Sequence, residues 1–320
     1  MKKLGLLLIA SAALLSSCSI NKLAINAVSN ALTGSGSSDV FTGDGDPRLV
    51  GDALPFAIKL YETLLAQNPN HQGLILTTGS LFVMYANAFV QGPAEMLPLN
   101  RYQEKADELE RAKNLYLRGA DILYTGLELK YPGFSTAFEN NTLDTYMAKM
   151  KKDDVPLLYW AVAGVLSAYS LDAFNMQLGI RIPELKAMIE RAYELDPDFN
   201  SGALDDFFVI FYSALPENLG GNKDLVYDHF QKAVEKSGGL SASPYVSYAR
   251  SVAIPAQDYE SFKTMLESAL AIDPDDDPSN RLMNILALQK AQFLLDNAGL
   301  YFIEFGSSDW DEWDWDWDYY

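Results

Sequence analysis

The strongest constraint on the fold is a repeated way of ending amphipathic stretches. Four such stretches stop at Asn-Pro, Tyr-Pro or Asp-Pro pairs, with the prolines at Pro69, Pro132, Pro197 and Pro274, which lie 63, 65 and 77 residues apart. Apolar residues recur at helical spacing before each proline. Because proline disfavours the helical conformation of the residue before it, each pair predicts the end of a helix. The sequence therefore predicts an all-α chain built from successive helices.

Two of these endings share a finer pattern. The segment 192–197 (AYELDP) has the same small–x–x–aliphatic–Asp–Pro order as 269–274 (ALAIDP), and 126–132 is one residue longer. This spacing resembles the end of the second helix of a tetratricopeptide repeat, where a small residue lets paired helices approach closely. Trp160 and Gly164 match the spacing in a first helix. We expect irregular tetratricopeptide-like helix-hairpin repeats that form a curved or toroidal body; an all-α bundle with chance proline stops is the alternative.

Helical periodicity and turn residues also predict where the other helices lie. The turn at 215–224 contains two adjacent glycines and restarts a helix with Asn222 as its N-cap, and the segment 90–98 is expected to break a helix in a similar way. The expected helices cover 73–91, 101–129, 155–175, 183–195, 202–214, 223–236, 242–253, 258–272 and 279–299.

The N-terminus has the pattern of a bacterial lipoprotein signal. A basic start and a short apolar run lead to LLSSC, which resembles a lipobox ending at Cys18, the single cysteine of the chain. A lone cysteine has no disulfide partner, so lipid attachment explains it better than an ordinary secretory signal with a chance cysteine. We expect a signal peptide at 1–17, a lipid-anchored flexible tether at 18–47, a helical-repeat domain at 48–306 and an acidic, aromatic tail at 307–320, expected to be disordered.

Charge and motifs exclude several functions. The net charge of −19 argues against nucleic-acid binding, which rewards lysine and arginine. His71 and His229 have no second metal ligand at a suitable spacing, so we expect structural or solvated roles and place His229 on an exposed-looking helix. The acids at 273–280 lack the glycine and glutamate of a calcium loop. Nucleotide-binding and hydrolase motifs are not found. We expect no enzyme activity, no cofactor and no metal.

Aromatic residues supply the candidate binding side chains. They crowd two expected helices, and most would lie in the core, but those on the concave face of a helical array could line a ligand channel or a partner surface. The candidates for ligand or partner binding are Tyr85, Phe89, Trp160, Phe208 and Tyr212. In the tail, Trp313, Trp315 and Trp317 alternate with aspartates, which leaves a disordered end, a docking peptide or a metal-binding segment as alternatives.

The order of motifs resembles a known family. A lipobox, AIKLYETLLAQNPNHQGLILTTGSLFVMYANAFV, LLYWAVAGVLSAY, RAYELDP and LPENLGGNKDLVYDHFQKAVEKS follow one another over about residues 1–300. This looks like the TatT component family of periplasmic lipoproteins associated with TRAP transporters. The resemblance implies a toroid-like all-α body, a homotrimer, a periplasmic solute-binding protein of a TRAP transporter as partner, and a pore or cleft suggested to hand on apolar ligand.

From these observations we expect a non-catalytic scaffold that assists uptake of a small, apolar organic acid or similar ligand. It would be periplasmic and anchored to a bacterial membrane through the lipid on Cys18; Ser19, in place of a retaining Asp, favours the outer membrane. An outer-membrane assembly lipoprotein that binds partner proteins is the alternative. An enzyme that uses carboxylate pairs has little support, because a chain with 43 acidic residues contains such pairs by chance.

Overall fold

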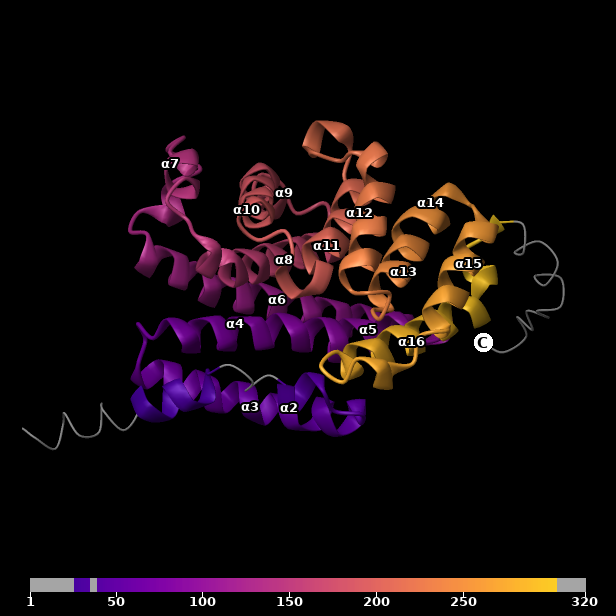
Figure 1. Ribbon diagram of the computed structural model, residues 1–320, viewed down its shortest axis with the longest axis horizontal. Helices are drawn as coiled ribbons and strands as arrows, with labels where there is room; N and C mark the ends of the chain where they lie inside the picture. Colours follow the sequence, from indigo (N-terminus) through magenta and orange to yellow (C-terminus); the bar gives the residue numbers. More distant parts are fainter. Residues whose placement is uncertain (1–25, 35–38, 304–320) are drawn as a thin grey trace, which may run out of the picture.

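The computed structural model describes residues 26–34 and 39–303 of the chain. All regular secondary structure in this part is helical and no strand is present in it, which confirms the predicted all-α class (Figure 1). Residues 26–32 are helical. The α-helices that follow are α2 (Asp39–Thr42), α3 (Pro47–Gln67), α4 (Gln72–Tyr85), α5 (Gly92–Glu95), α6 (Tyr102–Lys130), α7 (Leu143–Met147), α8 (Val155–Leu171), α9 (Met176–Gly179), α10 (Ile182–Leu195), α11 (Ala203–Ala214), α12 (Lys223–Lys236), α13 (Ser243–Tyr248), α14 (Ile254–Ala256), α15 (Tyr259–Leu270) and α16 (Arg281–Asp296).

The predicted helix ends are present at all four prolines. Helices α3, α6 and α10 each end two residues before Pro69, Pro132 and Pro197, and α15 ends four residues before Pro274. The predicted N-cap of α12 is also present, since the side chain of Asn222 accepts a hydrogen bond from the Asp224 N–H at 3.2 Å. Local sequence therefore fixes where these helices begin and end.

Small residues bring the three central helices into close contact. A Cβ atom on Gly79 of α4 would lie 2.9 Å from the Gly119 carbonyl oxygen of α6 and 2.4 Å from Leu123 Cγ. A Cβ on Gly164 of α8 would lie 3.1 Å from the Tyr116 carbonyl oxygen of α6 and 3.1 Å from Val83 Cγ2 of α4. Because these glycines leave no side chain between the helices, α6 packs closely against both α4 and α8.

Two helices contain π-helical turns ahead of a proline. The turn Ala86–Gln91 joins α4 to α5, where Pro93 lies, and the turn Ala249–Ala253 joins α13 to α14, where Pro255 lies. Proline cannot donate to the carbonyl four residues earlier, and a π turn shifts the hydrogen-bond register there. The helix predicted to break at 90–98 therefore continues through Pro93 and ends at Glu95.

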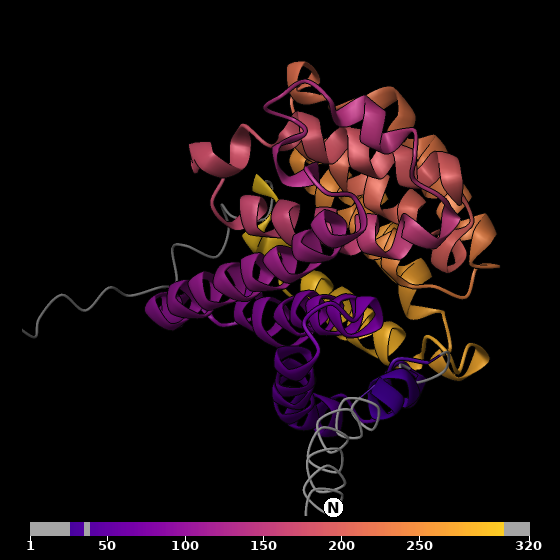
Figure 2. The ribbon, with the colours of Figure 1, turned by 90° about the vertical axis from the view of Figure 1, so that its left-hand side faces the viewer.

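The last long helix returns to the first. Figures 1 and 2 show α16 beside α2 and α3, and Leu282 of α16 is buried in the cluster that contains Leu54 of α3. Glu95, at the end of α5, pairs with Arg250 at 2.9 Å and with Lys290 of α16 at 2.7 Å. An apolar cluster thus joins α16 to α3, and ion pairs join α5 to α16 and to the turn Ala249–Ala253. A regular repeat and a toroidal body stay predictions.

Part of the predicted tether contacts the body. The Tyr61 hydroxyl of α3 donates to the Leu32 carbonyl at 2.8 Å, and the His71 ring lies 2.9 Å from Asn30 Oδ1. The predicted signal peptide, Cys18 and the tail at 307–320 lie outside the described residues, and the predicted domain boundaries stay predictions.

In the described part of the chain, two helical segments, 72–95 and 152–171, are long and apolar enough to cross a membrane by length and composition. In each, an apolar window of 18 residues is about half buried, 56% in the first and 50% in the second. Both segments contain central helices that pack against α6. Packing inside the body therefore accounts for their apolar character, as in the core helices of other globular proteins.

Candidate functional site

A cavity of about 1050 Å³ lies between helices that are far apart in the chain. Helices α4, α8, α11, α13 and α16 all contribute to its wall. This volume is at the upper end of the range for small-molecule sites. The cavity is the candidate functional site.

Helical spacing explains which side chains face the cavity. On α8, Trp160, Ala163 and Ser167 lie on the wall, and on α11, Phe207 and Phe211 do. The spacings of three and four residues place each group on one face of its helix. The opposite faces of α8 and α11 pack in the main hydrophobic cluster. Each helix therefore separates the core from the cavity.

The wall also has polar groups. Ser243 and Ser247, one turn apart on α13, lie on it with Asp206 of α11. The Ser243 hydroxyl donates to Asp206 Oδ2 at 2.6 Å. Burial raises the pKa of Asp206 above its ordinary value, against the opposing effect of the two serine hydroxyls. Burial, and then the charge of Asp206, raise the pKa of Tyr159, which lies on the same wall.

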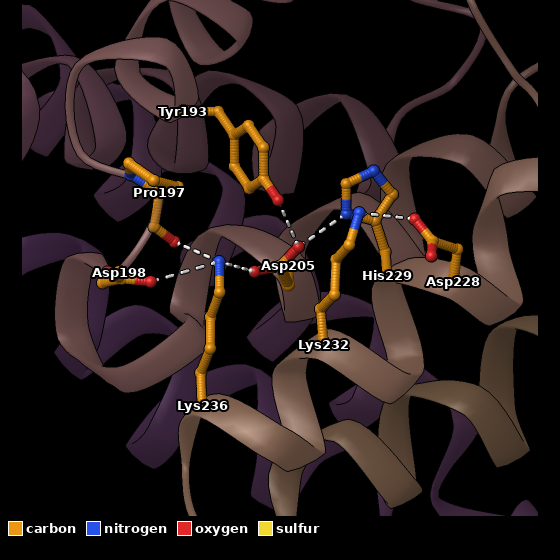
Figure 3. Close-up of polar contacts among 8 residues, drawn as sticks. All are labelled: Tyr193, Pro197, Asp198, Asp205, Asp228, His229, Lys232 and Lys236. Carbon is orange, nitrogen blue, oxygen red and sulfur yellow. Dashed lines mark hydrogen bonds and ion pairs between the residues drawn. The ribbon is translucent and has the colours of Figure 1, made fainter.

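A buried polar network holds the other side of α11 (Figure 3). Asp205 is fully buried and accepts from Lys236 at 2.7 Å and from the Tyr193 hydroxyl at 3.0 Å, and His229 Nδ1 lies 2.7 Å from the same carboxylate. Burial opposes the ionisation of Asp205, but the hydrogen bonds from His229 and Lys236 outweigh it and lower its pKa. The network joins α10, α11 and α12 and fixes the helix that carries Asp206.

The expectation that His229 lies on an exposed face of its helix is wrong. The side chain is buried, and its ring packs edge-on against Tyr193 and at a tilt against Phe208 and Tyr212. The reason is that α12 turns the same face, which also carries Phe230, toward α11. His71 caps α4 by accepting the Leu74 N–H at 3.1 Å, which is a structural role.

The structure separates the five aromatic candidates. Trp160 lies on the cavity wall, whereas Phe208 and Tyr212 stack on each other in the core with ring centroids 5.0 Å apart. Tyr85 and Phe89 stack together at 6.0 Å beside α3, away from the wall. Their role in binding stays a prediction, as does lipidation at Cys18.

Sequence reasoning missed several wall residues. Tyr159, Asp206, Phe207 and Phe211 line the cavity but were not candidates. The i, i+4 spacing of Phe207 and Phe211 on α11 can be seen in the sequence, but Phe208 and Tyr212 on the same helix have this spacing too. Which of the two pairs faces the core depends on how α12 packs against α11, and the sequence does not show that packing. No group of three His, Cys, Asp or Glu side chains that could hold a metal occurs in the described part of the chain.

Comparisons with known proteins give the chain a family. A family model described as TRAP transporter T-component matches residues 43–302, which contain every cavity-forming helix named above. A curated protein of Treponema pallidum (strain Nichols), described as an uncharacterized protein, is 34% identical over 310 residues. The match covers 92% of this chain and 96% of that protein. These matches confirm the resemblance seen in the sequence, and the chain belongs to the TRAP transporter T-component family.

Proposed function

We propose that this chain is a non-catalytic periplasmic lipoprotein that binds the solute-binding subunit of a TRAP transporter and assists uptake of a small ligand. Family membership supports a role beside a TRAP transporter. The observation that carries the ligand part is the cavity, whose 1050 Å³ and aromatic wall suit a small organic molecule better than a protein segment.

The proposal gives the chain a location and a partner. Lipid on Cys18 anchors it to a bacterial membrane, with the outer membrane favoured, and the body works as a homotrimer beside the solute-binding subunit. The lipobox and the family resemblance support this arrangement. The rigid packing of α4, α6 and α8 suits a scaffold that presents one preformed cavity.

Crosslinking in the native cell tests the partner. The full lipoprotein is captured after crosslinking, and the proteins joined to it are identified by mass spectrometry. The proposal predicts the TRAP solute-binding subunit, with the signal lost in cells that lack that subunit. Recovery of a barrel-assembly protein in its place would support the assembly role and contradict the proposal.

A further inference from the structure

The cavity wall has acidic groups and, among the described residues that line it, no lysine, arginine or histidine. Its two ionisable side chains with a carboxyl group are Asp206 and Asp277. An ionised carboxylate that entered would lose water and find no basic side chain on the described wall to pair with. The net charge of −19 of the whole chain adds to this effect, since it repels anions and attracts cations. The wall thus disfavours the ionised form of an organic acid.

Asp206 has unused acceptor capacity. Its Oδ2 accepts one hydrogen bond from Ser243, whereas its Oδ1 is buried and has no hydrogen-bond partner among the described residues. The Ser247 hydroxyl also acts on this carboxylate. A carboxylate can accept about four hydrogen bonds, so two serine hydroxyls leave part of its capacity free. A ligand that donates to this carboxylate would offset the cost of its burial.

Aromatic rings line the same cavity as this carboxylate. Tyr159 packs edge-on against Trp160 with centroids 5.2 Å apart and against Phe207 with centroids 6.3 Å apart. All three rings line the cavity together with Asp206. Aromatic faces attract organic cations, and their apolar area favours the rest of such a molecule. A carboxylate beside aromatic rings is a suitable environment for an ammonium group.

We propose that the cavity binds an apolar amine, with its ammonium group paired to Asp206 and placed against the rings of Tyr159, Trp160 and Phe207. The apolar part of the ligand then lies along the surfaces of Leu166 and Ile210, which also face the cavity. The delivery of this ligand to a transporter rests on the proposed function, but its binding is measured on the protein alone.

Tryptophan fluorescence provides the test. In the full chain, Trp310, Trp313, Trp315 and Trp317 are changed to phenylalanine, so that Trp160 is the single tryptophan left. This protein is titrated near neutral pH with octylammonium, 1-octanol and octanoate, which have equal chain lengths and different charges. We expect octylammonium to bind roughly tenfold to a hundredfold more tightly than 1-octanol, and octanoate to bind most weakly. Octanoate binding as tightly as octylammonium would overturn the proposal.

A pair of variants separates the carboxylate from general charge attraction. Asp206→Asn should lower the affinity for octylammonium roughly tenfold and leave that for 1-octanol unchanged. Asp121→Asn, at an exposed position of α6 outside the wall, makes the same change in net charge and should leave both affinities unchanged. Equal losses in the two variants would show that only net charge matters and would overturn the site. If the Asp206→Asn protein does not fold, the relative affinities of the three ligands for the parent protein still test the proposal.

The two proposals can fail separately. If the solute-binding subunit is captured in cells but the cavity shows no preference for octylammonium, the transporter role is supported and the amine site is contradicted. If the cavity clearly prefers octylammonium but the subunit is not captured, the amine site is supported and the proposed partner is contradicted.

Discussion

At the scale of residues, Asp205 and Asp206 show how one helical turn can hold two different carboxylates. Asp205 faces α10 and α12, is fully buried and has hydrogen-bond donors from three side chains. Asp206 faces the cavity, where the hydroxyls of Ser243 and Ser247 act on it and its Oδ1 has no hydrogen-bond partner among the described residues. The first carboxylate is satisfied by the protein and stabilises it, whereas the second keeps capacity for a ligand.

The first prediction concerns Asp205. Asp205→Asn removes the charge that Lys236 and His229 contact inside the fold, and we expect a loss of about 2–4 kcal/mol in the free energy of unfolding. Urea unfolding followed by circular dichroism measures it. The control is Asp228→Asn, which breaks an exposed pair with Lys232 (Figure 3) and should cost less than about 1 kcal/mol. Equal costs in the two variants would contradict the structural role of the network.

At the scale of elements, the sequence predicts helix ends better than helix contacts. Proline and N-cap residues act within a few residues of themselves, so the ends at Pro69, Pro132 and Pro197 and the start at Asn222 follow from local chemistry. The continuation of the helix from α4 through Pro93 does not follow from local chemistry, because the π turn Ala86–Gln91 before this proline keeps the helix intact. The cavity face of α11 depends on α12 and α13, which are distant parts of the fold.

The second prediction tests helix packing. Ala192 of α10 is fully buried, so Ala192→Leu should overpack the interface and lower the free energy of unfolding by roughly 1–3 kcal/mol. Ala66→Leu, at an exposed position in the last turn of α3, is the matched control and should be close to neutral. An unchanged melting temperature for Ala192→Leu would count against the packing role of this small residue.

The third prediction uses the pH dependence of stability. Burial opposes ionisation of Glu95, but Arg250 and Lys290 lower its pKa from 4.5 to about 2. The pKa of Lys290 is itself lowered, first by burial, so the net contribution of the cluster is smaller than the Glu95 shift alone indicates. Because the folded pKa is below the unfolded one, the stabilisation is complete above pH 4.5 and is lost as the pH falls toward 2.

Glu95→Gln should therefore lower the free energy of unfolding by about 1–3 kcal/mol near neutral pH and flatten its decline between pH 4.5 and 2. Glu104→Gln, which changes an exposed pair with Arg101, serves as the control. Denaturant titrations across this pH range measure both variants. If the free energy of unfolding of the Glu95→Gln protein falls as steeply with decreasing pH as that of the parent, Glu95 is not the source of this pH dependence.

At the scale of the whole molecule, helix α16 returns to α2 and α3 and contributes to the cavity wall, and its Lys290 pairs with Glu95 of α5. The all-α class and the family could be predicted from sequence, because both rest on motifs and their order. The cavity could not be predicted, because helices as far apart in the chain as α3 and α16 contribute to its wall, and only the folded chain brings them together.

The fourth prediction tests the lipid anchor. Cys18→Ala removes the thiol that would carry the lipid, so the protein should move from the membrane fraction to the soluble fraction. Cell fractionation and immunoblotting measure this, with Ser19→Ala as the control that keeps the thiol. Tight membrane association of the Cys18→Ala protein would rule out lipid on this residue as the anchor.

We propose that this body binds the solute-binding subunit of a TRAP transporter, and native mass spectrometry of the two purified proteins measures that binding. We expect a complex that contains both chains and that is lost when an unrelated periplasmic binding protein replaces the subunit. Separate proteins at every concentration tested, or equal binding to the unrelated protein, would contradict it.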